Sequence, residues 1–230
     1  MTDPEIDWPA ATLSLDQRGH AVLPALLSAT QCQHIAALYP QPERFRSRVV
    51  MARHGFGRGE YQYFAYPLPA LLQHLRSALY PPLAAVANRW NQQLHLAPRY
   101  PATLQDYLAR CHAAGQQRPT PLLLQYGAGD YNCLHQDLYG DEVFPLQLAI
   151  LLSQPEVDFS GGEFVMTETD ADESRAEVIP LRQGDAVVFT VNQRPVPGQR
   201  GWRRVAMRHG VSELRSGHRH TVGLIFHDAH

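Results

Sequence analysis

The pattern of hydrophobic and polar residues changes character near the middle of the chain. Helical spacing dominates the first half, at residues 8–18, 29–38, 68–95 and 102–114. Ser28 is the predicted N-cap of the second helix, and Pro81–Pro82 is expected to interrupt the third. The first half also contains a short strand leading into the second helix, at residues 19–28, and two strand-like runs on either side of a glycine-rich turn, at residues 46–52 and 60–66.

After Pro121 the chain becomes a series of short apolar runs divided by turns. These strand-like runs are residues 122–127, 131–137, 146–153, 163–169, 177–181, 186–191, 203–210 and 220–226. Gly161–Gly162 and residues 183–185 are strong turn sequences between two such runs. Many short, turn-bounded strands indicate a sandwich or barrel. We therefore expect an α+β fold in which residues 1–118 pack on a β core formed by residues 119–230, as a single domain of residues 1–230.

Composition excludes several classes of protein. The hydrophobic content of 44% is ordinary, and neither general disorder nor a fibrous repeat is indicated. The sequence contains no apolar run near the roughly 18 residues that span a bilayer. Its acidic N-terminus lacks the pattern of a signal peptide, and its three widely spaced cysteines fit neither a disulfide framework nor a Cys-x-x-Cys site. The predicted location is the cytoplasm, with no membrane partner.

Charge is unevenly distributed along the chain although the formal net charge is only −2. All 20 basic residues are arginine. Residues 194–219 contain seven Arg and one Glu, whereas residues 156–177 contain eight acids and one Arg. Two interpretations remain open: a compositional bias toward arginine, or a face that binds anions, because guanidinium groups pair with phosphate and carboxylate.

The strongest candidate for chemistry is the pair His135 and Asp137. Residues i and i+2 of a strand project to the same face, so both side chains could ligate one metal ion. A closed sheet can bring His209, on a late strand, beside them. Two imidazoles and one carboxylate form a set that holds iron(II) on one face and leaves the remaining positions open for a co-substrate and O2.

A residue for the co-substrate follows on the next strand. If 2-oxoglutarate chelates iron through its keto-acid end, its far carboxylate needs a fixed cation, which Arg219 can supply. Thr221 lies on the same face of that strand and could add a hydroxyl hydrogen bond. Tyr126 or Tyr131, just before the first ligand pair, could add a phenol.

These motifs together resemble a known family. The sequences YGAGDYNCLHQD, SGGEF and QGDAVVF, with HGVS followed by GHRHT, are similar to those of the iron(II)/2-oxoglutarate-dependent oxygenases. The resemblance implies a double-stranded β-helix (jelly-roll) core over residues 119–230, with His135, Asp137 and His209 as iron ligands and Arg219 as the co-substrate anchor. With its segment MARHGFGRGEYQYFAYPLP, the chain also resembles a bacterial family predicted to demethylate damaged nucleic acid oxidatively.

The substrate class has several alternatives. DNA-dealkylating members carry a second Arg six residues after the anchor, where this chain has Ile225. The spacing upstream of His135 is similar to that of prolyl hydroxylases, which leaves hydroxylation of a protein side chain or of a small metabolite open. A non-catalytic metal-binding jelly-roll sensor and a nucleic-acid-binding module are two further alternatives.

Other arginine, tyrosine, histidine and cysteine residues are also candidates for a role. Arg58, Tyr61 and Tyr63 alternate a cation with aromatic rings and are the predicted substrate contacts, because rings stack on nucleobases. The alternative is an ordinary strand that packs one face in the core. His218 and His220 flank Arg219 and are expected to point away from it. His227 and His230 are not expected to be ligands, and Cys133 is expected to be a core residue.

Overall fold

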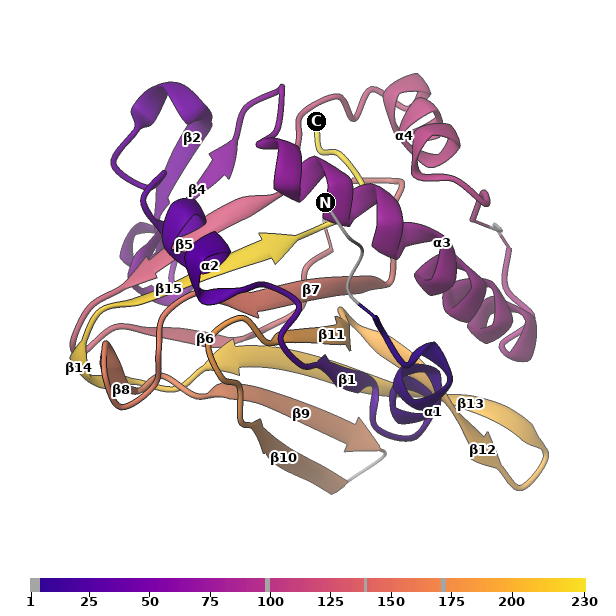
Figure 1. The fold of residues 1–230 in the computed structure, drawn as a ribbon. Helices are drawn as coiled ribbons and strands as arrows, with labels where there is room; N and C mark the ends of the chain where they lie inside the picture. Colours follow the sequence, from indigo (N-terminus) through magenta and orange to yellow (C-terminus); the bar gives the residue numbers. More distant parts are fainter. Residues whose placement is uncertain (1–4, 98–99, 139, 171–172) are drawn as a thin grey trace.

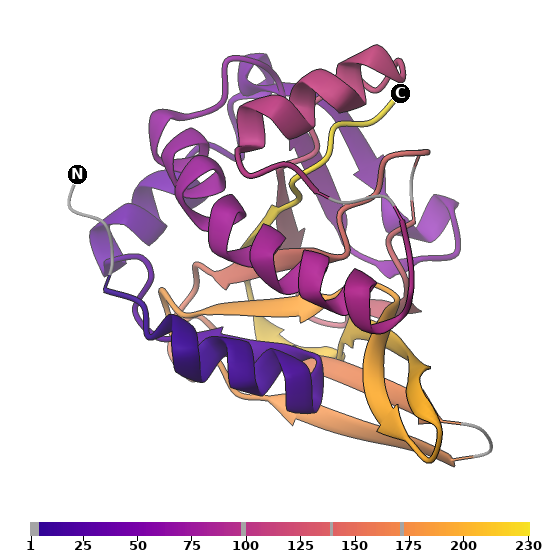
Figure 2. The ribbon, with the colours of Figure 1, turned by 90° about the vertical axis from the view of Figure 1, so that its right-hand side faces the viewer.

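The chain folds into two facing β-sheets with helices on the outer side of the larger one (Figures 1 and 2). A computed structural model describes residues 5–97, 100–138, 140–170 and 173–230. Within these ranges the larger sheet has seven strands in the order β1 (His20–Leu23), β11 (Ala186–Thr190), β7 (Leu146–Leu151), β15 (Arg219–Leu224), β5 (Leu122–Tyr126), β4 (Glu60–Phe64) and β2 (Phe45–Val50).

The smaller sheet carries much of the predicted chemistry. Its order is β10 (Glu173–Ile179), β9 (Phe164–Asp170), β13 (Gly201–Val211), β6 (Tyr131–His135) and β3 (Gly57–Arg58), with β12 (Gln193–Gly198) paired to β13. β8 (Phe159–Gly161) and β14 (Leu214–Gly217) form a separate pair. The α+β fold with a jelly-roll core is confirmed, and the predicted turns at residues 161–162 and 183–185 lie between strands.

The predicted helices are present in the first half of the chain. They are α1 (Trp8–Arg18), α2 (Ala29–Ala36), α3 (Ala70–Gln93) and α4 (Leu104–Ala113), with short 3-10 turns η1 (Pro42–Arg44) and η2 (Met51–Arg53). Ser28 caps α2, because its hydroxyl accepts a hydrogen bond from the Gln31 N–H and the Gln31 side chain accepts one from the Ser28 N–H. None of the helices in the described ranges is long and apolar enough to cross a membrane.

Helix α3 differs from its prediction. It continues through Pro81–Pro82 instead of being interrupted there. Tyr80 before the two prolines and Leu83 after them are fully buried in the core that α3 shares with the larger sheet. Burial on both sides of the prolines outweighs the local cost, which is about 3 kcal/mol for one proline in a helix interior.

The first half also supplies strands to the larger sheet. β1 pairs with β11 at one end of the sheet, and β4 pairs with β5 near the other end. The compositional boundary near residue 119 therefore falls inside a continuous sheet. Apolar residues of β7 and β11 meet those of β9 and β13 between the sheets, where Ala149, Val187, Phe164 and Met207 are buried together.

A β-bulge in β6 changes which side chains face the space between the sheets. His135 lies opposite His209, but Asn132 lies opposite Val211, so three steps along β6 match two along β13. Asn132 and His135 consequently share the inner face. Cys133 is exposed and is not the predicted core residue, because the extra residue reverses the alternation. The strand also ends at His135, two residues earlier than predicted.

Candidate metal and co-substrate site

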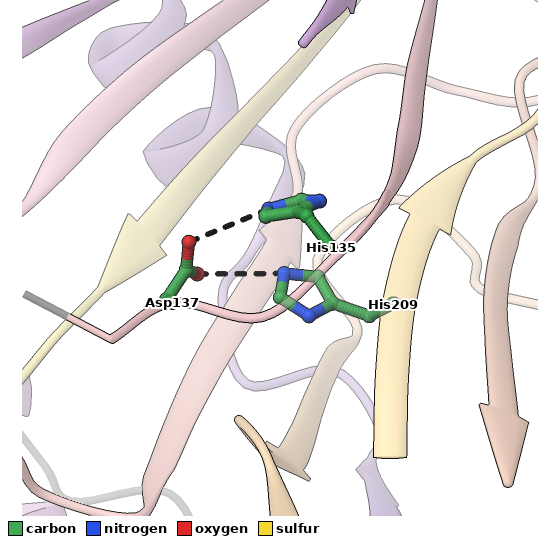
Figure 3. A group of neighbouring side chains, drawn as sticks. All are labelled: His135, Asp137 and His209. Atoms are coloured by element: carbon green, nitrogen blue, oxygen red, sulfur yellow. Dashed lines mark ion pairs between the residues drawn. The ribbon is translucent and has the colours of Figure 1, made fainter. Parts of the chain in front are cut away.

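His209 is distant in the sequence from His135 and Asp137, and the three side chains meet between β6 and β13. His135 ends β6, Asp137 lies just beyond it, and His209 faces them from β13 (Figure 3). The His135 Nε2 lies 3.4 Å from the Asp137 Oδ1, and the His209 Nε2 lies 3.5 Å from the Asp137 Oδ2. One ligand atom from each residue lies within 4.8 Å of the other two, a spacing that suits a single shared ion.

The backbone fixes how His135 presents its ring. Its Nδ1–H donates a hydrogen bond of 2.8 Å to the carbonyl oxygen of Cys133. In the neutral ring this bond makes Nε2 the nitrogen with the free lone pair, and Nε2 is the nitrogen that faces Asp137. Metal-binding histidines commonly donate their second ring N–H to a carbonyl in this way, because the bond fixes both tautomer and ring orientation.

Electrostatics keep the carboxylate ionised. Burial alone would raise the pKa of Asp137, but hydrogen bonds and charge from His135 and His209 hold this pKa well below its ordinary value. Burial lowers the pKa of His209, with Asp137 opposing the shift. Burial also acts to lower the pKa of His135, yet the hydrogen bond and charge of Asp137 raise it overall. An ionised carboxylate between two imidazoles is a strong cation site.

Gln147 is a further polar residue at this site, which the sequence interpretation missed. Its Nε2–H donates to the Asp137 Oδ2 at 2.5 Å and lies 3.5 Å from the His209 Nε2. The Gln147 Oε1 is buried and has no hydrogen-bond partner within the described part of the chain. The available clue was a single amide in the apolar run LQLAIL, where every residue is buried.

Arg219 lies deeper in the same cavity with little to neutralise it. The side chain is 2% exposed, and its Nε and Nη1 have no hydrogen-bond partner among the described residues. Its guanidinium carbon lies 5.5 Å from the Tyr126 ring centre and 5.9 Å from the Phe159 ring centre. Burial lowers the pKa of Arg219, although arginine stays protonated in proteins. A buried, unpaired guanidinium of this kind needs an anion.

The neighbours of Arg219 fit the same interpretation. The Thr221 Oγ1 is buried and makes no hydrogen bond to any described residue. Burial raises the pKa of Tyr126 to about 12, so its phenol stays protonated and can donate. Gly162, at φ +62°, lies close to both Leu214 and Arg219, since a Cβ there would be 2.3 Å from the Leu214 Cδ1 and 3.1 Å from the Arg219 Cδ. This glycine belongs to the turn that the sequence predicted.

Most of the predicted site residues line one cavity, and two do not. It has a volume of about 180 Å³ and is lined by the three candidate ligands together with Arg219, Thr221, Tyr126, Tyr61, Tyr63, Gln147, Asn132, Phe56 and Ile225 among others. Tyr131 and Arg58 pair with each other across β6 and β3, and neither lines the cavity. Of the two tyrosines considered for the co-substrate, the structure therefore favours Tyr126.

The other histidines lie away from the cavity, as expected. His220 packs its ring against Tyr39 at a centroid distance of 5.8 Å, and both His218 and His220 border a separate surface hollow. His227 is buried, and its Nδ1 accepts a hydrogen bond from the Phe144 N–H. Within the described residues, His135, Asp137 and His209 are the one group with a ligand-type arrangement.

The donor set fits iron(II) and 2-oxoglutarate. Two imidazole nitrogens and one carboxylate without a thiolate suit iron(II), and the three ligand atoms lie within 4.8 Å of one another. The unpartnered polar atoms of Arg219 and Thr221 lie in the same cavity, where a carboxylate would satisfy them. The cavity thus combines a donor set for a metal ion with polar groups that a carboxylate would satisfy.

Comparisons with known proteins identify a family. Residues 59–229 match a family described as "Oxygenase, catalysing oxidative methylation of damaged DNA". An uncharacterized protein of Mycobacterium tuberculosis is 50% identical over 167 residues, which are 72% of this chain and 72% of that protein.

Solved structures share the fold at low sequence identity. A prolyl-4-hydroxylase of Pseudomonas putida has a TM-score of 0.55 and 15% identity, covering 97% of this chain and 99% of its own. An oxidoreductase of the 2OG-Fe(II) oxygenase family from Burkholderia pseudomallei has a TM-score of 0.57 and 16% identity, covering 100% and 95%. The family match spans well over half of the sequence, and the predicted superfamily is confirmed. The chain therefore belongs to this oxygenase family, within the superfamily of iron(II)- and 2-oxoglutarate-dependent dioxygenases.

Proposed function

We propose that this oxygenase demethylates damaged nucleic acid, with His135, Asp137 and His209 holding iron(II) and Arg219 holding the far carboxylate of 2-oxoglutarate. One observation carries the assignment of these roles. The three-residue cluster and a buried guanidinium without an anionic partner line the same cavity. A structural arginine would have an acid beside it, whereas a co-substrate anchor is left unpaired for its ligand.

The bound groups supply the chemistry, and the chain supplies the arrangement. When bound, iron(II) couples the decarboxylation of 2-oxoglutarate by O2 to insertion of one oxygen atom into a substrate C–H bond. The other oxygen atom enters succinate, and carbon dioxide leaves. A methyl group on nitrogen thereby becomes a hydroxymethyl group, which is lost as formaldehyde. The side chains position the reactants and exclude water from the cavity.

The cavity walls support a nucleobase as the group that is presented. Tyr61 and Tyr63 line it with their rings 5.4 Å apart at 89°, and the Arg46 guanidinium lies 4.4 Å from the Tyr63 ring centre. Such surfaces stack on bases, which enzymes turn out of the strand before reaction. The volume of about 180 Å³ is small beside the roughly 300–1,000 Å³ of typical ligand pockets. The nucleic-acid chain would therefore remain outside while the damaged group enters.

Two features of the chain shape this proposal. Ile225 lines the cavity where dealkylating relatives carry Arg, so the base would meet an apolar wall.

We also infer that residues 1–230 work as one domain, since strands of the first half complete the larger sheet. The cytoplasmic location remains a prediction.

The test is turnover with defined substrates. Iron-loaded enzyme is supplied with 2-oxoglutarate, O2 and oligonucleotides that carry methylated or unmodified bases, and succinate and formaldehyde are measured. We expect both products from methylated oligonucleotides, and neither from the His135→Ala or Asp137→Ala variants. His218→Ala serves as a matched control with full turnover.

The opposite result would assign another substrate. Oxygen incorporation into a peptide or metabolite pool, with methylated oligonucleotides inert, would make the enzyme a hydroxylase. Full turnover by His135→Ala would refute the ligand assignment.

A further inference from the structure

The smaller sheet separates its charges between its two faces. Along β13, Val205, Met207 and His209 are buried on the inner face, whereas Arg204 and Arg208 alternate with them and are exposed. Directly opposed residues of antiparallel strands lie on the same face of a sheet. Arg208 lies opposite Thr167 of β9, so both belong to the outer face.

The acidic residues of β9 and β10 lie on the inner face. Glu168 lies opposite Met207, and Glu177 lies opposite Met166. Three acids of this face pair with arginines that also lie on it or beside it: Glu168 with Arg194 at 2.5 Å, Glu177 with Arg18 at 3.6 Å, and Asp170 with Arg203. The outward residues of β9 and β10 are all neutral: Val165, Thr167, Thr169, Ser174, Ala176 and Val178.

A third arginine extends the outer face toward the cavity. Gly57 lies opposite Asn132, and Arg58 lies opposite Tyr131. Because Asn132 lines the cavity, Arg58 points outward. No ion pair within the described residues includes Arg58, Arg204 or Arg208. Among the residues that the structure describes, no helix covers the outer side of β9 and β10, along the bottom of Figures 1 and 2.

The backbone positions of the three arginines are evenly spaced along the strand direction. Arg204 and Arg208 are four residues apart on β13, which is about 13 Å at roughly 3.3 Å per residue. The register of β6 places Arg58 level with residue 212, another four residues or about 13 Å further along. The three positions therefore cover about 26 Å along the strand direction, and Arg58 also lies two strands to the side of β13.

We propose that this outer face, defined by Arg58, Arg204 and Arg208, binds the phosphate backbone of nucleic acid. The choice of ligand rests on the proposed function, and charge complementarity supports it, because three unpaired arginines lie on a face without acids on these strands. Phe56, next to β3, is 41% exposed and also lines the cavity. A strand held on the outer face would reach the cavity over this edge of the sheet. The Arg-rich run at residues 194–219 thus has two roles. Some of its arginines form the anion-binding outer face, and others form ion pairs on the inner face.

The experiment measures the salt dependence of binding. Iron-loaded, oxygen-free enzyme is titrated with a labelled single-stranded oligonucleotide at several salt concentrations, and fluorescence anisotropy gives the affinity. Three phosphate contacts contribute about 2 to the log–log slope at roughly 0.7 per contact. The triple variant Arg58→Ala/Arg204→Ala/Arg208→Ala should lose this contribution to the slope. Between 50 and 200 mM salt, the affinity of the parent should therefore fall about 20-fold more than that of the variant.

A second triple variant controls for net charge. Arg18→Ala/Arg48→Ala/Arg175→Ala removes the same charge from exposed side chains that each pair with an acid. It should keep the slope of the parent. Equal slopes for the two triple variants would overturn the proposal, as would equally tight binding of poly-glutamate by the parent.

Turnover of a free methylated nucleoside separates this proposal from the proposed function. Equal turnover by the parent and the outer-face triple variant, with different slopes, supports both. A slope difference without turnover of any methylated substrate would retain the binding face and remove the demethylase assignment. Turnover with no slope difference would retain the demethylase and overturn the binding face.

Discussion

Two fully buried arginines occupy opposite situations in this molecule. Arg76, on α3, is 0% exposed and donates to the carbonyl oxygens of residues 225–227, to the Tyr66 hydroxyl and to the Asp228 carboxylate at 2.8 Å. Arg219, on β15, is 2% exposed and lies between two aromatic rings with Nε and Nη1 unpartnered within the described chain.

The difference between them distinguishes an arginine buried to stabilise the fold from one buried to bind a ligand. Arg76 ties the chain after β15 to α3, and every part of its guanidinium is used. Burying Arg219 without a partner costs stability unless a ligand supplies the anion. The first residue should therefore affect folding and the second should affect co-substrate binding, which gives each a distinct experimental signature.

The largest expected effect is on stability at Arg76. Arg76→Met leaves the buried Asp228 carboxylate without its main partner, although His112 still lies 2.9 Å from its Oδ2. Breaking a buried pair on one side typically costs about 3–5 kcal/mol. Urea unfolding should show this loss. The double variant Arg76→Met/Asp228→Asn should recover part of it, and a single variant as stable as the parent would contradict the structural role.

The next effect is the pH dependence of the segment that Arg76 holds. Burial, followed by the charge of Arg76, lowers the pKa of His227 to about 4. Because this folded-state pKa lies below the ordinary 6.5, the unfolded chain binds more protons between these values. The contribution of neutral His227 to the free energy of unfolding is therefore fully present above pH 6.5. It is lost as the pH falls toward 4 and amounts to about 3 kcal/mol.

Replacement of His227 isolates this contribution. His227→Gln retains an acceptor for the Phe144 N–H but does not titrate. Its free energy of unfolding should vary less between pH 4 and 6.5 than that of the parent. Identical pH profiles for both proteins would show that another group is responsible.

A smaller effect is expected at Gln147, on the functional side of the comparison. Gln147→Leu removes the N–H that fixes Asp137 just beyond the end of β6. Loss of a hydrogen bond to a metal ligand typically costs about 10- to 100-fold in metal affinity. Calorimetry with cobalt(II), together with the cobalt absorption spectrum, should show weaker and altered binding.

Gln62→Leu provides the matched control for this variant. Gln62 is also a buried glutamine of the larger sheet, but it donates to the Tyr39 carbonyl oxygen. It should leave cobalt binding unchanged. Unaltered affinity and spectrum in a folded Gln147→Leu protein would mean that the amide only fills space.

Local patterns predicted much of the fold and several of the residues that line the cavity. The 3.6-residue spacing located the helices, and the i, i+2 rule placed Arg219 and Thr221 on one face of β15. The His-x-Asp pair and His209 meet as the sequence indicated.

Features that depend on strand register or on tertiary packing could not be predicted from local sequence patterns. The bulge in β6 exposes Cys133 and depends on pairing with β13, which local alternation does not reveal. Continuity of α3 through Pro81–Pro82 depends on burial against a distant sheet. Gln147 contacts Asp137 only after β7 and β6 are brought together, so its role could not follow from its own neighbours.

The affinity of Arg219→Met for 2-oxoglutarate tests the central claim most directly. Calorimetric titration of the iron-loaded, oxygen-free enzyme should show a loss of about 2–5 kcal/mol, the usual cost of removing one partner of a buried charged pair. Iron affinity and stability should be retained, and Arg215→Met, an exposed arginine paired with Glu163, should bind 2-oxoglutarate like the parent. Unchanged 2-oxoglutarate affinity in a folded, iron-binding Arg219→Met protein would contradict the account.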